Sequence, residues 1–321
     1  MSEPGCGDPW MALRASFPIF EQRVYLASQC LGPWPRQAHR DLEQYRSSRQ
    51  LHNRALDAWF ERIDLTTKQI EHLIAAPRGS VALRESATGA HAALLAAIEP
   101  SSARNRLVVT ELDFHSTLHL CSAQTRRGFE LVVVPSRDHS RIVAEDVLAQ
   151  IDERTAVVSV AMVSRYSALL DVSALVARAH EVGALVIVDA YQAAGIVPLD
   201  VVELGVDALV AGNHKWLSGD TGLAFLYVEP ALVERLQPMY PGWFGHQDID
   251  GFVHAHTFVD AYRPVTGARR FQQGTPPMQP IYGARAGLEL VLEVGVARLR
   301  ARNLELTAQL WQGASELGLR C

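Results

Sequence analysis

Short runs of apolar, often β-branched residues recur between residues 106 and 228. Runs in which nearly every position is apolar are typical of strands buried on both faces of a sheet. The segments 117–128, 144–151 and 172–182 lie between them and place apolar residues at helical spacing. This alternation predicts an α/β fold with a mostly parallel sheet wrapped by helices. The predicted strands are RLVVTE (106–111), ELVVVP (130–135), AVVSVAMV (156–163), ALVIVD (184–189), ALVAG (208–212) and LAFLYV (223–228).

The regions on either side of this core have different patterns. Residues 1–55 contain proline, charges and only short apolar runs, which predicts an N-terminal arm that packs on another element. We expect residues 56–280 to form a large domain, and a long helix from Ile281 to about Leu317 to begin a small C-terminal domain over 281–321. The chain stops where that domain would begin its strands, so we expect a fragment or an unusually short member of its class. The last predicted strand follows its predecessor too closely for a crossover helix, which predicts one antiparallel strand.

Composition favours a globular protein that acts on small molecules. Of the 321 residues, 48% are hydrophobic and 20% are charged, which is enough to bury a large core. The net charge is -5, without a long run of one sign, which argues against a nucleic-acid partner. No apolar stretch reaches the ~18 residues of a membrane span and no signal-peptide pattern opens the chain, so we expect a cytoplasmic protein. Four scattered cysteines without metal-ligand spacing are expected to be reduced and mostly structural: Cys6, Cys30, Cys121 and Cys321.

Two consecutive predicted strands are followed by an acid and an amine. Asp189 ends ALVIVD, and Lys215 comes shortly after ALVAG, between His214 and Trp216. Groups at the carboxyl ends of neighbouring parallel strands converge on one crevice. Pyridoxal phosphate needs a lysine that forms a Schiff base and an acid that keeps its ring nitrogen protonated. Aspartates often end strands and most lysines are solvated, so it is the pair that suggests this cofactor.

A candidate phosphate site lies upstream of this pair. In the segment 85–90, small residues and hydroxyls precede the apolar helix HAALLAAI. Free N–H groups and the helix dipole favour an anion at such a position, although an ordinary N-cap has the same pattern. Phe114 follows the RLVVTE strand and could stack on a cofactor ring, or could belong to the core.

Together these residues resemble the class V branch of fold-type I pyridoxal-phosphate enzymes, and the second half of the chain is similar to kynureninase. The most specific match is Gly-Trp-Phe-Gly-His at 242–246, followed by Tyr-Arg-Pro at 262–264, Arg-Phe at 270–271 and Gly-Thr-Pro-Pro at 274–277. The resemblance covers nearly the whole chain. It implies a mostly parallel seven-stranded sheet and a homodimer with shared active sites.

The resemblance also implies roles for individual residues. Asp189 would pair with the pyridinium nitrogen and Lys215 would carry the cofactor as a Schiff base. The other implied cofactor contacts are Ala87 and Thr88 at the phosphate, Phe114 on the ring face with Ser116 and Thr117 nearby, and Trp243 and Thr275 at the neighbouring subunit's cofactor.

Several positions depart from the kynureninase pattern. Gln192 stands where kynureninases carry histidine, and His214 stands where they carry tyrosine. Both choices resemble cysteine desulfurases, in which the glutamine donates to the ring oxygen of the cofactor and a histidine precedes the lysine. The arginine that grips the substrate carboxylate lies, in the family, beyond the position of Cys321. Other departures are Gln29-Cys30, His115-Ser116-Thr117 and Tyr166-Ser167.

Three hypotheses follow. The first is a kynureninase-like hydrolase that cleaves the Cβ–Cγ bond of kynurenine or a related γ-keto amino acid, as in tryptophan catabolism, giving alanine and an aromatic acid. The second keeps the cofactor but performs another class V reaction, as a cysteine desulfurase or other lyase, an aminotransferase or a biosynthetic enzyme. The third is a non-catalytic relative with the same fold. The retained Asp189 and Lys215 argue against the third.

Overall fold

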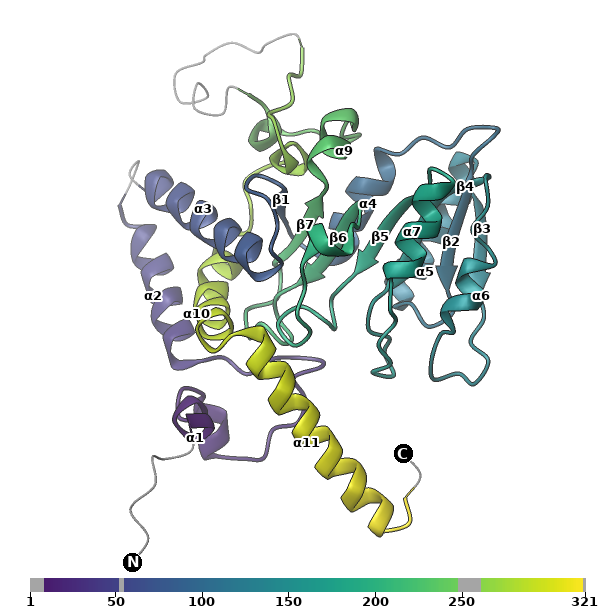
Figure 1. Ribbon diagram of the computed structural model, residues 1–321. Helices are drawn as coiled ribbons and strands as arrows, with labels where there is room; N and C mark the ends of the chain where they lie inside the picture. Colours follow the sequence, from purple (N-terminus) through teal and green to yellow (C-terminus); the bar gives the residue numbers. More distant parts are fainter. Residues whose placement is uncertain (1–8, 52–54, 248–260, 320–321) are drawn as a thin grey trace, which may run out of the picture.

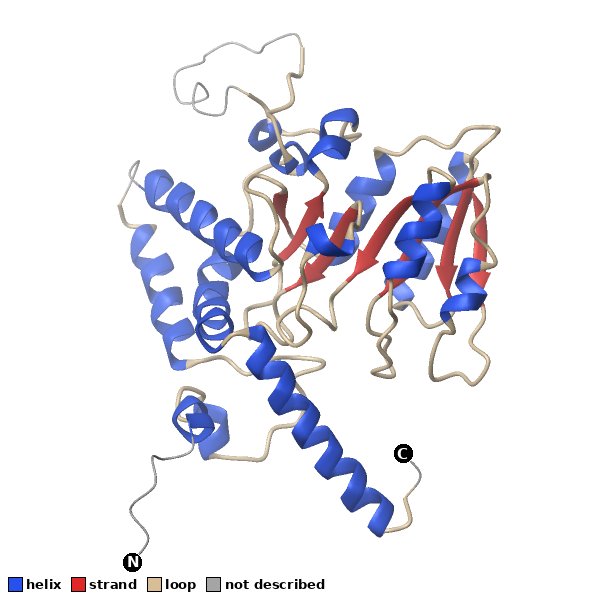
Figure 2. Cartoon of the chain, viewed as in Figure 1, coloured by secondary structure: helices blue, strands red, loops and turns tan. Residues whose placement is uncertain are grey.

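The computed structural model describes residues 9–51, 55–247 and 261–319. Cys6 and Cys321 lie outside the described residues, as does part of the motif-rich segment after Trp243, namely 248–260. The centre of the molecule is a seven-stranded sheet with helices on both faces (Figures 1 and 2). This confirms the predicted fold class.

The strands follow the order β1-β7-β6-β5-β4-β2-β3. β7 pairs antiparallel with β1 and β6, and the other neighbours are parallel, so the predicted antiparallel strand is confirmed. The sequence pattern predicted the residues of six strands. The seventh strand, β1, was implied by the family resemblance but was not assigned to any residues. The bounds are β1 (Val81–Arg84), β2 (Arg106–Thr110), β3 (Glu130–Val134), β4 (Thr155–Ala161), β5 (Leu185–Asp189), β6 (Ala208–Gly212) and β7 (Ala224–Val228).

Helices of both faces pack on alternate strand residues. On β5, Val186 and Val188 belong to the core under α7 and α10, whereas Ile187 belongs to the core under α4 and α5. Side chains alternate between faces along a strand, so Asp189 points to the α4 side. The α-helices are α1 (Pro9–Arg14), α2 (Arg36–Ser48), α3 (Ala55–Leu73), α4 (Ala87–Ala96), α5 (His115–Ala123), α6 (Ala144–Leu148), α7 (Ser173–Glu181), α8 (Val201–Leu204), α9 (Pro230–Arg235), α10 (Met278–Val294) and α11 (Val296–Glu316).

The long C-terminal helix predicted from Ile281 is two helices. Gly295 separates α10 from α11 with φ +85°, a left-handed conformation that breaks the helix and that glycine adopts without strain. Ile281 and Leu288 on α10 are fully buried in the core, whereas no residue of α11 is buried. α11 therefore projects from the body of the molecule (Figure 1).

The N-terminal arm contacts its own chain at the candidate site. The N–H of Gly32 donates to the carbonyl of His214, and the Trp34 indole N–H donates to the carbonyl of Gly219. Farther along the arm, Asp41 on α2 is fully buried and forms a bidentate ion pair with Arg285 on α10, with N–O distances of 3.0 and 2.6 Å. The arm thus helps to hold the loop that carries Lys215.

None of the helices in the described part of the chain has the length and apolar character to cross a membrane.

Replacing Arg285 with alanine is expected to lower the free energy of unfolding by ~3–5 kcal/mol, because the Asp41 carboxylate would remain buried without its cation. Urea denaturation followed by circular dichroism measures this change. Arg302→Ala removes the exposed pair with Glu305 and is the matched control, with a much smaller expected effect. Equal losses in the two variants would contradict the role of the Asp41–Arg285 pair.

Candidate active site

A pocket of about 500 Å³ lies at the carboxyl edge of the sheet, on the α4 side. A volume of this size accommodates a small cofactor together with a substrate. It is lined by Gln29, Cys30, Ser86, Ala87, Thr88, His91, Leu112, Phe114, Ser116, Thr117, Ala161, Val163, Arg165, Asp189, Tyr191, Gln192, Val210, His214 and Lys215. The structure therefore brings together nine of the residues that the sequence analysis named for the cofactor: Ala87, Thr88, Phe114, Ser116, Thr117, Asp189, Gln192, His214 and Lys215.

Asp189 and Lys215 meet in this pocket because β5 and β6 are parallel neighbours. Asp189 accepts hydrogen bonds from the N–H of Tyr191, at 2.9 Å, and from the Thr117 hydroxyl. Burial raises the pKa of Asp189, and the charge of Lys215 opposes the shift. Burial likewise lowers the pKa of Lys215, and the charge of Asp189 opposes that shift. The lysine amine therefore has a larger neutral, nucleophilic fraction than a solvated lysine.

The loop that carries Lys215 is closely packed from two sides. Its backbone folds back on itself, with the Ser218 N–H donating to the carbonyl of Lys215. A Cβ atom added to Gly32 would lie 1.9 Å from the Lys215 carbonyl oxygen, and one added to Gly287 would lie 1.9 Å from that of Leu217. Only glycine fits at these two contacts, so the arm and α10 together fix the position of the lysine backbone.

Residues at the N-terminus of α4 line the pocket. Ser86 caps the helix through its side chain, which accepts from the Gly89 N–H at 3.0 Å. The N–H groups of Ala87 and Thr88 have no partner within the helix, as expected in a first turn. The helix begins at Ala87, earlier than the apolar pattern indicated, and Ser86 forms the predicted cap. The anion site at the same helix end stays a prediction.

Phe114 belongs to the pocket and not to the core. Its side chain is 54% exposed, and the Lys215 Nζ lies 5.7 Å from the centre of its ring. Thr117, one turn later at the start of α5, is buried and bonds Asp189. The aromatic ring therefore forms a wall beside the amine and is free to stack on a planar ligand.

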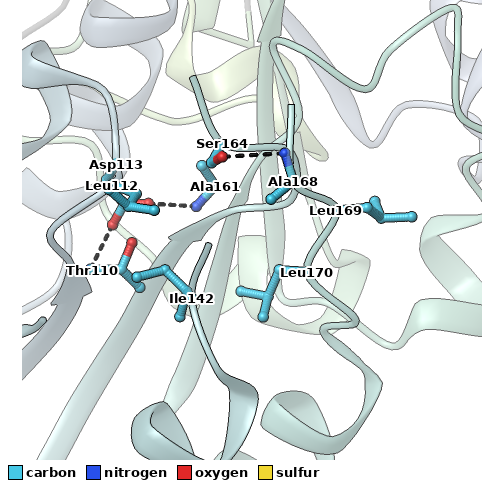
Figure 3. Close-up of a pocket in the computed structure, with 9 residues that line it drawn as sticks. All are labelled: Thr110, Leu112, Asp113, Ile142, Ala161, Ser164, Ala168, Leu169 and Leu170. Atoms are coloured by element: carbon cyan, nitrogen blue, oxygen red, sulfur yellow. Dashed lines mark hydrogen bonds between the residues drawn. The ribbon is translucent and has the colours of Figure 1, made fainter. Parts of the chain in front are cut away.

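Asp113, next to Phe114 in the sequence, connects two strands of the sheet through hydrogen bonds. The sequence analysis did not single it out. It is 1% exposed, and its two oxygens accept from the N–H groups of Thr110 and Ala161, each at 2.7 Å (Figure 3). It thereby links the ends of β2 and β4 beside the small cavity drawn in Figure 3. Burial raises the pKa of Asp113 to about 7, although both hydrogen bonds oppose the shift.

A strained loop follows β4, next to the buried Asp113. Ser164 Oγ accepts from the Ala168 N–H (Figure 3). Ser167, just before Ala168 in the sequence, has φ +66°, a conformation that favours glycine. Ser167 is one of the positions that depart from the family pattern. The chain thus makes a turn of positive φ at this position with a serine.

Gln192 and His214 are held by neighbours within the chain. Gln192 accepts from the Trp216 indole N–H at 2.9 Å and donates to the carbonyl of Gln29 at 3.1 Å. His214 Nδ1 lies 2.9 Å from the Tyr191 hydroxyl. Cys30, expected to be structural, is exposed and lines the pocket. The sequence offered little reason to assign Cys30 and Tyr191 to the site. No motif surrounds Cys30, and an aromatic residue two positions after Asp189 is not specific to any function.

Trp243 and Thr275 do not line this pocket. Trp243 packs against Phe244, with ring centres 4.3 Å apart, and Thr275 is exposed. Of the adjacent arginines, Arg270 is 3% exposed, bonds the carbonyls of Val233, Leu236 and Val265 and pairs with Glu234, so it has a structural role.

Comparison with known proteins places this geometry in a family. Residues 25–320 match the family model of class V aminotransferases. The chain belongs to that family. The uncharacterized aminotransferase YcbU of Bacillus subtilis is 31% identical over 308 residues, covering 96% of this chain and 80% of that protein. The kynureninase of Geobacillus thermodenitrificans is 28% identical, covering 94% and 72%.

Solved structures of fold-type I enzymes share the class V fold seen here. The cysteine desulfurase of Thermococcus onnurineus superposes with a TM-score of 0.84 at 21% identity, covering 99% of this chain and 78% of that one. A second neighbour, a variant of the enzyme C-DES, carries glycine covalently linked to its pyridoxal-phosphate cofactor. Membership of the class V aminotransferase family supports pyridoxal phosphate as the cofactor, as predicted.

The residues present fit that cofactor. The pocket supplies an amine with a lowered pKa, a carboxyl group that a nearby cation would stabilise, a helix N-terminus with free N–H groups and an exposed aromatic ring. These four features correspond to the aldehyde, the ring nitrogen, the phosphate and the ring face of pyridoxal phosphate.

The raised pKa of Asp113 makes the stability of the fold depend on pH. The folded carboxyl titrates near 7 and the unfolded one near 3.8, so the folded state binds more protons between these values. The unfolding free energy of the wild type, relative to Asp113→Asn, should therefore fall by up to ~4 kcal/mol as the pH rises from roughly 4 to 7. Urea titrations of both proteins at several pH values measure the difference.

Asp138→Asn provides the opposite case. Hydrogen bonds from the N–H groups of Ser140 and Arg141 hold the pKa of this exposed carboxyl well below its usual range, so the contribution of Asp138 should be lost on acidification.

A flat difference between wild type and Asp113→Asn over the same range would mean that the two backbone bonds keep Asp113 ionised.

Proposed function

We propose that this chain is a kynureninase-like hydrolase that cleaves the Cβ–Cγ bond of kynurenine or a related γ-keto amino acid, releasing alanine and an aromatic acid. The observation that carries the proposal is the single pocket in which Asp189, Lys215 and the N-terminus of α4 converge. The kynureninase relatives and the Gly-Trp-Phe-Gly-His segment at 242–246 favour this substrate class.

Lys215 serves as the attachment point and as the base. When bound, pyridoxal phosphate supplies an electron sink for charge that develops at the Cα atom of an amino acid. The partly desolvated Nζ of Lys215 would hold the cofactor and, once free of it, would accept the Cα proton of the substrate. The lowered pKa suits this task, because it leaves more of the amine unprotonated at neutral pH.

Asp189 holds a proton on the ring nitrogen of the cofactor. A carboxyl group raised in pKa by burial gains most from an adjacent cation, so Asp189 favours a protonated partner. The Thr117 hydroxyl and the Tyr191 N–H keep its oxygens oriented. Ala87 and Thr88 would bind the phosphate through the first turn of α4, and the exposed Phe114 would stack on the ring face.

The proposal includes a homodimer. Trp243 and Thr275 lie outside the pocket of their own chain, which is compatible with a contact to the cofactor of a second copy. In that arrangement each subunit would complete the phosphate site of the other, and an isolated subunit would be inactive.

A second candidate is cleavage of a carbon–sulfur bond in a cysteine-like substrate. The specific observation in its favour is Cys30, whose thiol lines the pocket close enough to influence the charge of Lys215. Gln192 and His214 also follow the desulfurase pattern. A thiol at the pocket wall could receive sulfur from such a substrate.

Attachment of the cofactor can be tested at a single residue, because the chain has only two lysines, Lys68 and Lys215. Reduction of the cofactor-loaded protein with borohydride, followed by peptide mass spectrometry, should place the label on Lys215. Lys215→Ala should abolish the label and the visible absorbance of the bound cofactor, whereas Lys68→Ala should change neither. Asp189→Asn should retain the label and lower turnover by about 100-fold or more. Labelling of Lys68, or none at all, would contradict the proposal and favour a non-catalytic relative.

Substrate class is tested with cofactor-loaded protein whose dimeric state is confirmed by light scattering. Kynurenine and 3-hydroxykynurenine should yield alanine and the corresponding aminobenzoate, detected by fluorescence and chromatography. Cysteine and cystine should yield no sulfide. Sulfide release that is lost in Cys30→Ser, with no aromatic acid formed, would replace the first candidate with the second.

A further inference from the structure

Tyr191 contacts three parts of the candidate site at once. Its N–H donates to Asp189, its hydroxyl lies 2.9 Å from His214 Nδ1, and its ring centre lies 4.5 Å from the Lys215 Nζ. The residue is thus the direct connection between the loop after β5, which begins at the acid, and the loop after β6, which carries the amine.

The space for this ring is created by the last residue of β6. A Cβ atom added to Gly212 would lie 2.1 Å from the Tyr191 hydroxyl oxygen and 2.2 Å from Cζ. No side chain other than hydrogen fits there while the tyrosine keeps its position. The geometry therefore depends on a tyrosine and a glycine on neighbouring strand ends.

The protonation states of the pair allow the tyrosine to be the donor of its hydrogen bond. Burial and the charge of Asp189 raise the pKa of Tyr191, so its hydroxyl keeps its proton. Burial and the charge of Lys215 lower the pKa of His214, so its imidazole is neutral near pH 7. A protonated phenol can donate to Nδ1 of the neutral imidazole, and in that arrangement Nε2 carries the hydrogen.

We propose that Tyr191 is a positioning residue that holds His214 as the Nε2–H tautomer, so that the imidazole presents a donor to an anionic oxygen of the cofactor. His214 lines the pocket, and the hydrogen bond at Nδ1 is the only one that its imidazole makes to another described residue. The inference rests on the proposed use of this pocket for pyridoxal phosphate. It adds a residue that the family resemblance does not assign.

The tautomer can be observed without any cofactor. In protein labelled with ¹⁵N-histidine, the two ring nitrogens of a neutral imidazole give separate signals, and His214→Ala assigns the signal among the 12 histidines. Wild-type protein should show a bare Nδ1 and a protonated Nε2 at His214. Tyr191→Phe keeps the ring but removes the donor, and should leave a mixture of tautomers. A protonated Nδ1 in the wild type, or identical signals in both proteins, would overturn the inference.

Cofactor affinity provides the second measurement. Loss of one hydrogen bond should weaken pyridoxal phosphate binding by about tenfold in Tyr191→Phe. Tyr166→Phe makes the same chemical change at an exposed tyrosine outside the pocket lining, and should have no effect. In a His214→Ala background the Tyr191→Phe change should have no further effect. An equal loss in both backgrounds would show that the hydroxyl acts independently of His214.

Pyridoxal, which lacks the phosphate, distinguishes the two anionic oxygens that His214 could meet. A Tyr191→Phe effect confined to pyridoxal phosphate identifies the phosphate, and an effect on both ligands identifies the ring oxygen. Either result supports the inference, whereas no effect on either ligand contradicts it. If Lys215→Ala keeps the visible absorbance of the bound cofactor, the proposed function fails, while the tautomer measurement still tests the Tyr191–His214 pair alone.

Discussion

Withdrawing a carboxylate and an amine from water costs free energy, and each group lowers that cost for the other when they share one pocket. Asp189 and Lys215 are in this situation at the carboxyl edge of the sheet. Their pKa values are displaced by burial, and each charge opposes the displacement of the other. The surrounding structure keeps the two groups in one pocket and prevents them from moving into solvent.

That constraint explains much of the surrounding structure. Parallel pairing of β5 with β6 sets the spacing, and side-chain alternation turns Asp189 toward α4. The loop after β6 is then held by backbone contacts from Gly32 in the arm and Gly287 in α10. Elements far apart in the sequence thus meet at one backbone segment, because a reactive amine is useful only when its position is fixed.

The parts of the site that could be predicted from sequence are those set by local pattern. Buried strands predict their own carboxyl ends, so Asp189 and Lys215 were found directly. The helix-start pattern indicated the segment 85–90, and the family resemblance singled out Ala87 and Thr88 within it. β1 is only four residues long and carries no pattern of its own, and the break at Gly295 is hidden inside a continuous helical pattern. Cys30, Asp113 and Tyr191 depend on tertiary contacts, which one-dimensional spacing does not record. The limits of the predicted large and small domains stay predictions.

Arginine outnumbers lysine in this chain by 28 to 2, and the second lysine, Lys68, is paired with Asp64 on α3. Guanidinium groups do not condense with simple aldehydes under conditions in which amines do, so Lys68 and Lys215 are the only side-chain amines open to carbonyl reagents. An aldehyde-bearing probe shaped to enter the pocket would therefore meet a single side-chain amine there. The same scarcity makes the protein a suitable scaffold for attaching synthetic carbonyl catalysts at a defined, partly enclosed amine.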